Sequence, residues 1–255
     1  MAVRIWQQSP DKRFRWETLS AKYLPGALSV LRTSFNVNET VCRVIGITQT
    51  DKGSRQFEDL VKIVMQNGVS VIAVEVESDE VVGIAVNRIQ VKGDSEFANY
   101  LEKEMKSTDS DPAYQEIIRF VSQMEEKVDI FEHYGVTTIL DHMFLATHVN
   151  YYQKGIGRGL VAATVDLARA LNRGEDVGVP ISDDKYPWKN KKLPQVEAVI
   201  ALFTSQKSQK IGKNLGWDEI FVARYDQLFY NGESYSSRLE KDNQTTVYMS
   251  IRVDK

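Results

Sequence analysis

The sequence contains little that would place it in an oxidising compartment. Its 255 residues include a single cysteine, Cys42, which cannot form a disulfide within the chain. The N-terminal stretch MAVRIWQQSPDKRFRW also lacks the apolar core of a secretion signal. We therefore expect the reducing setting of the cytoplasm.

Long hydrophobic runs and an excess of positive charge are also missing. The longest apolar runs, residues 69–76 and 198–203, have the length of a strand and fall far short of a membrane span. The formal net charge is −3, and neither an arginine-rich stripe nor a zinc-ligand spacing occurs. We therefore expect no membrane partner, no nucleic-acid partner and no bound metal.

The composition is that of a globular protein, with 42% hydrophobic and 26% charged residues. Apolar spacing predicts a mixed α and β chain with a central sheet, in one domain over residues 1–255. Surface loops are expected near residues 93–113, 174–194 and 226–245. The predicted strands cover residues 4–9, 69–91 as a hairpin, 135–149, 195–203, 217–225 and 245–253. The predicted helices cover residues 20–35, 39–45, 54–68, 97–106, 114–134, 160–171 and 205–216.

Three alternating glycines stand where the strand over residues 135–149 passes into a helix. Gly155, Gly157 and Gly159 leave the backbone without Cβ atoms, so a ligand can approach the main chain closely there. The helix that follows places its apolar residues on one face at steps of three and four, and we expect this face to pack inward. These residues are Leu160, Val161, Thr164, Leu167, Ala168 and Leu171.

Several interpretations of this glycine run compete. The glycines can simply allow the chain to turn from strand to helix. A dinucleotide motif needs glycine where Leu160 stands, and a nucleotide P-loop needs a terminal Gly-Lys-Ser/Thr that is absent. A third interpretation is a pyrophosphate site, because a helix N-terminus presents unpaired N–H groups and a positive dipole end. Lys154 and Arg158 would add positive charge.

The run Tyr152 to Gly157 resembles a motif of the GCN5-related N-acetyltransferases, Arg/Gln-x-x-Gly-x-Gly/Ala. The glycines match, while Tyr152 takes the leading place and Gln153 comes one residue later. The preceding hairpin, the following strand and the sequence NLGW at residues 214–217 extend the resemblance from about Val69 onward. The resemblance implies this α/β (α+β) fold, with a mostly antiparallel sheet, and acetyl-CoA as co-substrate. The implied cofactor-binding residues are Leu145, Ala146, Thr147, Tyr152, Gln153, Lys154, Gly155, Ile156, Gly157, Arg158, Gly159 and Lys213.

A narrower resemblance is to the insect-type arylalkylamine N-acyltransferases. The segment SFNVNETVCRVIGI, residues 34–47, places Glu39 where that family carries its catalytic glutamate. Thr204 and Ser208 have the spacing of two assisting hydroxyl residues of the family. Many other acetyltransferases carry a general-acid tyrosine at the place of Gly212, and it is missing here. The resemblance implies transfer of an acetyl group from acetyl-CoA to a small primary amine, arylalkylamine or polyamine-like.

The chemistry explains why such residues are needed. An alkylamine with a pKa near 10 is protonated at neutral pH, and removing its proton costs about 3 pKa units, or roughly 4 kcal/mol. Glu39 is the candidate base, directly or through a water. The amine then attacks the thioester directly, and N–H groups near Leu145 to Thr147 are expected to stabilise the oxyanion.

Structural roles remain open for every candidate. Glu39 can be a solvated carboxylate at a helix end, and Thr204 and Ser208 can be a strand end and a helix cap. His142 and Cys42 are expected to be structural, with His142 as the next candidate base. The aromatic residues around the last loop can roof an acceptor pocket or simply anchor the loop: Tyr225, Phe229, Tyr230 and Tyr235. A CoA-binding protein without activity and a protein N-acetyltransferase are the alternative functions. The sequence leaves the amine, the acyl length and the oligomeric state open.

Overall fold

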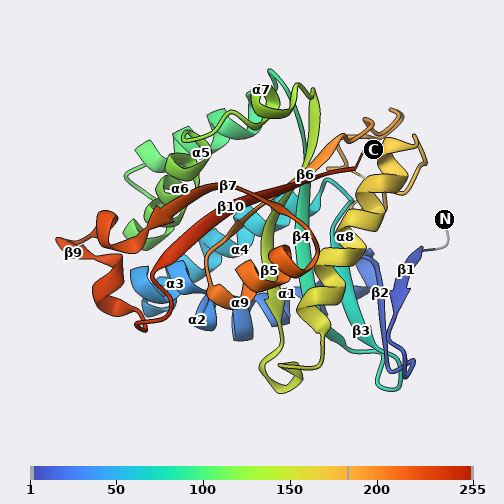
Figure 1. Ribbon diagram of the computed structural model, residues 1–255, viewed down its shortest axis with the longest axis horizontal. Helices are drawn as coiled ribbons and strands as arrows, with labels where there is room; N and C mark the ends of the chain where they lie inside the picture. The colour runs from blue at the N-terminus through green and yellow to red at the C-terminus, as the bar shows by residue number, and fades with distance from the viewer. Residues whose placement is uncertain (1–2, 183, 254–255) are drawn as a thin grey trace.

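A large twisted sheet crosses the protein in the computed structural model, which describes residues 3–182 and 184–253 (Figure 1). Within these residues the sheet has eight strands in the order β1-β2-β3-β4-β5-β6-β10-β7. Strands β5 and β6 are parallel, and the other neighbours are antiparallel. The strands are β1 (Ile5–Gln8), β2 (Phe14–Thr18), β3 (Val71–Glu75), β4 (Val81–Val91), β5 (Thr138–Thr147), β6 (Ala198–Phe203), β7 (Asp218–Arg224) and β10 (Thr245–Arg252). A separate small pair is formed by β8 (Phe229–Tyr230) and β9 (Glu233–Ser234).

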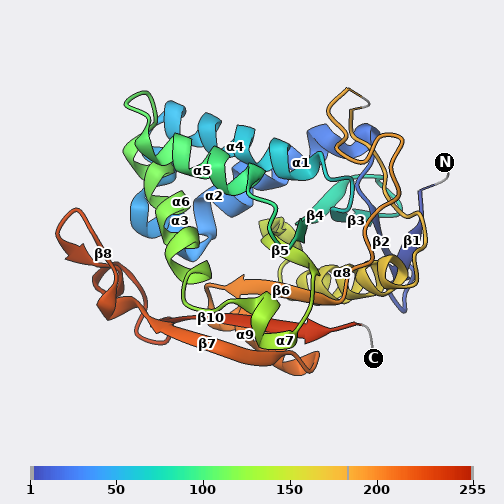
Figure 2. The ribbon, with the colours of Figure 1, turned by 90° about the horizontal axis from the view of Figure 1, so that it is seen from above.

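Helices cover both faces of this sheet (Figure 2). On one face lie α1 (Leu24–Val30), a π-helical turn (Leu31–Phe35), α2 (Asn36–Asn38), α3 (Thr40–Ile45), α4 (Asp51–Met65), α5 (Glu96–Lys106) and α6 (Pro112–Glu125). On the other lie α8 (Ile156–Asn172) and α9 (Gln206–Asn214). The short helix α7 (Ile130–Tyr134) precedes β5 and packs in one cluster with residues of β5, β6 and β10. The prediction of a mixed, mostly antiparallel sheet flanked by helices is confirmed. In the described part of the chain, no helix has the length and apolar character needed to cross a membrane.

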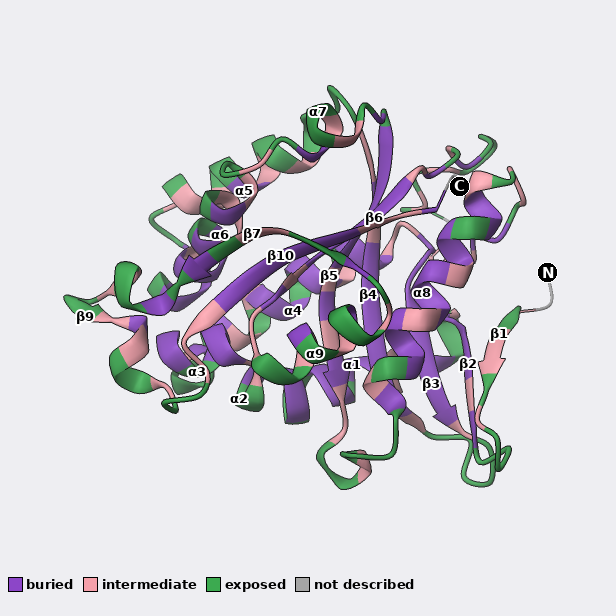
Figure 3. Cartoon of the chain, viewed as in Figure 1, coloured by how far each residue is buried: buried purple, intermediate pink, exposed green. Residues whose placement is uncertain are grey.

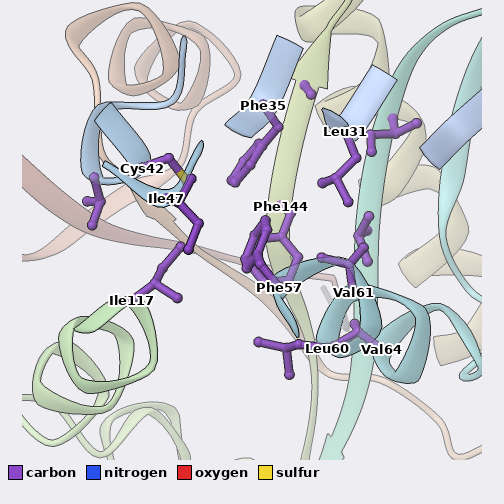
Figure 4. Close-up of a cluster of buried hydrophobic side chains, with 14 of the residues drawn as sticks. Leu31, Phe35, Cys42, Ile47, Phe57, Leu60, Val61, Val64, Ile117 and Phe144 are labelled. Atoms are coloured by element: carbon purple, nitrogen blue, oxygen red, sulfur yellow. The ribbon is translucent and has the colours of Figure 1, made fainter. Parts of the chain in front are cut away.

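The core between the sheet and the first helical layer is built on three phenylalanines (Figure 4). The ring centroids of Phe35, Phe57 and Phe144 lie 5.2–5.6 Å apart, as one stacked and two edge-on pairs. Together they join the π-helical turn, α4 and β5. Since Phe35 lies four residues before Glu39, this packing fixes the segment that carries Glu39. Buried residues follow the strands and the inner helix faces, and exposed residues follow the rims (Figure 3).

The inward face predicted for the helix after the glycines is also confirmed. All six residues of that face in α8 are buried, against β3, β4 and β5.

Some elements differ from the sequence predictions. Strand β2 was not predicted, because Arg15 and Glu17 give it a polar appearance; in the fold the two side chains form an ion pair at 2.7 Å. The predicted helix over residues 114–134 is divided, because the Asp129 side chain caps a new helix by accepting from the Glu132 N–H. Most of the expected loop at residues 93–113 is helix α5 and the start of α6. The region 226–245 contains the small β8–β9 pair.

Candidate active site

A cavity of about 750 Å³ opens where β5 and β6 separate. The two strands pair only as far as His142 and Ala201, after which β6 continues against β10 while β5 runs on beside β4. The segment with Glu39, the end of α6 and the glycine turn complete the walls. The separation of two parallel strands thus brings together residues that are far apart in the sequence.

The edge of β5 that faces the cavity offers backbone donors. The His148 N–H donates to the Val82 carbonyl, and donors alternate along an antiparallel strand. The Ala146 N–H therefore faces β4, while the N–H groups of Leu145 and Thr147 face the gap left by β6. All three predicted residues line the cavity, and two of them can direct an N–H into it.

The glycine turn forms another wall of the same cavity. Gln153 and Gly155 have positive φ angles of 63° and 78°, which bend the chain sharply into α8. In the described chain, the first N–H groups of α8, those of Ile156, Gly157 and Arg158, have no hydrogen-bond acceptor. Unpaired N–H groups at a helix start suit an anion such as a pyrophosphate. Tyr152, Gln153, Gly155, Ile156, Gly157 and Arg158 all line the cavity.

The third glycine has a different neighbour. A Cβ atom at Gly159 would lie 2.2 Å from the Trp16 ring of β2, and the Gly159 N–H already donates to the Gly155 carbonyl. The Trp16 indole N–H in turn donates to the Ile156 carbonyl at 3.3 Å. Packing against Trp16 therefore explains the absence of a side chain at Gly159.

Two predicted lysines also lie outside the cavity walls. The Lys154 ammonium lies 4.6 Å from the centre of the Tyr151 ring, beside the turn. Lys213 forms an ion pair with Glu219 at 2.5 Å. A contact of either lysine with the co-substrate stays a prediction.

Glu39 interrupts the helical segment and faces the cavity half-buried. Its backbone is extended, with φ −65° and ψ 141°, so it caps α3. Its Oε2 accepts the Cys42 N–H at 2.7 Å, and its Oε1 accepts the Thr204 hydroxyl at 2.5 Å. The carboxylate is thereby held between a helix start and the end of β6. Cys42 is buried in the hydrophobic core, and its predicted packing role is confirmed. Burial and the nearby Glu39 charge raise the pKa of its thiol.

Ser208 lies on the cavity wall and belongs to the cap of α9. Its hydroxyl donates to the Ser205 carbonyl at 2.9 Å and accepts the Ser205 N–H at 3.2 Å. The Ser205 hydroxyl accepts the Ser208 N–H in return, which completes a capping box. A catalytic role for Ser208 stays a prediction. At Gly212, a Cβ would lie 2.7 Å from the Phe203 ring and 2.8 Å from the Met249 sulfur, so a tyrosine has no room there.

His142 lies at the point where β5 and β6 separate. Its Nδ1 is 2.8 Å from the Asn87 Oδ1, and the Asn87 amide donates to the Val69 carbonyl. The Asn87 oxygen is therefore an acceptor, and the His142 Nδ1 carries the proton. Burial lowers the pKa of His142 to about 4, so the ring is neutral at pH 7. Its Nε2 has no hydrogen-bond partner.

A charged cluster at the inner end of the cavity was not predicted. Glu125 of α6, Asp141 of β5 and Tyr248 of β10 line the cavity, and Arg88 of β4 lies 3.5 Å from the Asp141 carboxylate. Burial is the largest cause that raises the pKa of Glu125, and the Asp141 charge adds to it. Burial also raises the pKa of Asp141, against the effect of Arg88. Sequence spacing gave no signal for this cluster, because its members come from four separate elements.

None of the four loop aromatics lines the cavity, and two of them, Tyr225 and Tyr235, anchor the chain. Tyr225 and Tyr235 are buried and stacked, with ring centroids 6.2 Å apart. Tyr225 donates to the Thr204 carbonyl at 2.7 Å, and Tyr235 donates to Glu116 at 2.8 Å. Tyr225 therefore fixes the backbone of the residue that contacts Glu39. Phe229 is 63% exposed. Among the described residues, no group of three or more His, Cys, Asp or Glu side chains is arranged to hold a metal ion.

Comparison with solved structures identifies the fold. Arylalkylamine N-acetyltransferase 2 from Aedes aegypti matches with a TM-score of 0.75 at 20% identity, over 94% of this chain and 99% of that one. The putative arylalkylamine N-acetyltransferase 7 from the same mosquito matches with a TM-score of 0.76 at 18% identity, over 100% and 97%. A polyamine N-acetyltransferase from Drosophila melanogaster matches with a TM-score of 0.68 at 13% identity, over 94% and 99%. Neither a family model nor a curated protein sequence matches the chain.

The chain therefore has the fold of the GCN5-related N-acetyltransferases, as the glycine motif predicted. Within that fold it resembles the insect arylalkylamine N-acetyltransferases over almost their whole length.

Proposed function

We propose that this protein is an N-acetyltransferase that moves an acetyl group from acetyl-CoA to a small primary amine in a ternary complex. The whole chain, residues 1–255, acts as one domain in the cytoplasm, and neither a membrane nor a nucleic acid takes part. The observation that carries the proposal is that one cavity contains both the unpaired N–H groups at the start of α8 and the Thr204-bound carboxylate of Glu39.

The chemistry of the cavity lining supports acetyl-CoA as the co-substrate. The unpaired N–H groups of Ile156, Gly157 and Arg158 suit its pyrophosphate. The N–H groups of Leu145 and Thr147 lie along the unpaired edge of β5, where they can bind the pantetheine arm and the thioester oxygen. A thioester placed there lies beside the end of β6, which carries Thr204.

Glu39 is the proposed general base. It removes a proton from the ammonium group of the substrate, directly or through a water, and the freed amine attacks the thioester carbonyl. The carbon–sulfur bond breaks, and the thiol leaves with a proton that water or a nearby hydroxyl supplies. Thr204 donates to Glu39 and positions its carboxylate. His142 is the alternative candidate base; burial lowers its pKa to about 4, and its Nδ1 is held by Asn87.

The test is a panel of small amines with acetyl-CoA, followed by thiol release and by the mass of the product. We expect turnover of at least one primary amine and a mass gain of one acetyl group. Binding of acetyl-CoA without turnover of any amine would instead support a non-catalytic CoA-binding protein. Acetylation of peptides alone would support a protein N-acetyltransferase.

A further inference from the structure

One end of the cavity carries two carboxyl groups, those of Glu125 and Asp141, and the Arg88 guanidinium lies 3.5 Å from the Asp141 carboxylate. Asp141 is 5% exposed, and its Oδ2 has no hydrogen-bond partner. The Arg88 contact at 3.5 Å is long, and Arg88 also stacks 4.1 Å from the Phe97 ring centre and donates to Gln90. The Asp141 carboxylate thus has one long ion pair to a guanidinium that makes other contacts, and the Arg88 charge also lowers the pKa of Glu125.

Such a cluster is incomplete without a ligand. Carboxylates removed from water need a counterion or hydrogen-bond donors to stay ionised. The pKa values of Glu125 and Asp141 are raised because burial removes water and Arg88 compensates this only in part. Tyr248 lines the same end of the cavity. Burial raises the pKa of its hydroxyl, and the charges of Glu125 and Asp141 raise it further. A ligand with a positive charge supplies what the cluster lacks, whereas a neutral hydroxyl group leaves the charge uncompensated.

The cavity lining also includes a group of apolar residues. They suit a methylene chain, and they come from α6 and β6: Ile117, Phe120, Val121 and Leu202. Asp141 pairs with Ile200, which lies four residues before Thr204 on β6. At about 3.3 Å per residue, this places the cluster about 13 Å along the strand from the residue that contacts Glu39. The reach of the side chains shortens the distance that a ligand has to span.

We propose that the preferred acceptor carries a second cationic group, as a linear diamine or guanidinoalkylamine does. Glu125 and Asp141 bind that second cation, and the first amine lies at Glu39. This inference rests on the proposed function and selects one class among the small amines.

The test compares amines that differ only in the second charge. The wild-type protein is assayed with linear diamines of four to eight carbons, with monoamines of equal length, and with tyramine. We expect kcat/KM for the best diamine to exceed that of its matched monoamine by at least about 10-fold, the value of one charged hydrogen bond. A ratio near one, or a preference for tyramine over every diamine, would overturn the inference.

Glu125→Gln identifies the residue responsible. It should reduce the diamine-to-monoamine ratio by about 10-fold, while Glu126→Gln, the exposed neighbour, should leave the ratio unchanged. An unchanged ratio in Glu125→Gln also contradicts the inference. If no amine is acetylated, the proposed function fails, and calorimetry with the same diamines then decides the inference. Diamine binding that is lost in Glu125→Gln supports it, and binding that is absent or equal in both proteins overturns it.

Discussion

The Thr204 hydroxyl donates to the Glu39 carboxylate at 2.5 Å, across 165 positions of sequence. The contact joins the gap between α2 and α3 to the end of β6, beside the point where β5 and β6 separate. The Tyr225 hydroxyl donates to the Thr204 carbonyl, and the Cys42 N–H donates to the second oxygen of the Glu39 carboxylate. Both oxygens of the carboxylate therefore have defined partners, as a positioned base requires.

Thr204→Val tests whether this positioning matters. The variant keeps the shape of the side chain and removes the donor, so we expect kcat to fall about 10-fold, the value of one hydrogen bond to a charged group. In Glu39→Gln/Thr204→Val the two losses should not add, because both act through one group. Steady-state kinetics on the four proteins measures this coupling. Additive losses would show that Thr204 acts independently of Glu39.

Ser208→Ala distinguishes a capping role from an acid role. Since the Ser208 hydroxyl donates to the Ser205 carbonyl, we expect a loss of about 1 kcal/mol of stability with kcat little changed. Ser205→Ala, which breaks the same capping box, is the matched control. A kcat that falls in Ser208→Ala and not in Ser205→Ala would assign Ser208 to catalysis.

Gly157 and Gly159 should respond differently to an added side chain. At Gly157 a Cβ meets only ordinary contacts, at 3.4 Å from Ile211 and 3.6 Å from Thr147. Gly157→Ala should therefore fold, and steric blockage of a phosphate should raise the Kd for acetyl-CoA at least about 10-fold, or 1.4 kcal/mol. Calorimetry measures this Kd. An unchanged value would contradict the proposal that the glycine turn binds the pyrophosphate.

Gly159→Ala is the contrasting variant. Its Cβ would lie 2.2 Å from the Trp16 ring, so overpacking should cost about 1–3 kcal/mol. Urea unfolding should show this loss, and the remaining folded protein should bind acetyl-CoA normally. A Gly159→Ala protein of wild-type stability would contradict the packing role of this glycine.

His142 should make stability depend on pH. Its pKa of about 4 in the folded protein lies below the unfolded value near 6.5, so the unfolded chain binds a proton first. The stabilisation is complete above pH 6.5 and is lost as the pH falls toward 4. At pH 5 the loss is about 2 kcal/mol. Urea unfolding at pH 7 and pH 5 should show this extra loss in the wild type relative to His142→Gln, and equal losses would contradict it.

Local patterns were enough to predict much of the fold. The apolar face of α8, the β3–β4 hairpin and the glycine turn each depend on residues close in sequence. Glu39 and Thr204 were predicted through a family resemblance, and the structure brings their side chains into contact.

Contacts between distant elements were not predictable in this way. The sequence around Gly159 does not predict its contact with Trp16, because the two residues meet only when β2 joins the sheet. The π-helical turn before Glu39 also depends on how Phe35 packs against Phe57 and Phe144. The Glu125–Asp141 cluster arises where α6 crosses the end of the cavity, and no spacing in the sequence encodes that crossing.

The central claim is that Glu39 is the base for amine acetylation, and kcat of Glu39→Gln tests it most directly. Glutamine keeps an oxygen for the Cys42 N–H, so the cap of α3, the melting temperature and the Kd for acetyl-CoA should stay near wild type. The loss of the base should lower kcat at pH 7 by about 10²- to 10⁴-fold with the best amine of the panel. A folded Glu39→Gln protein that acetylates this amine at the wild-type rate would contradict the account.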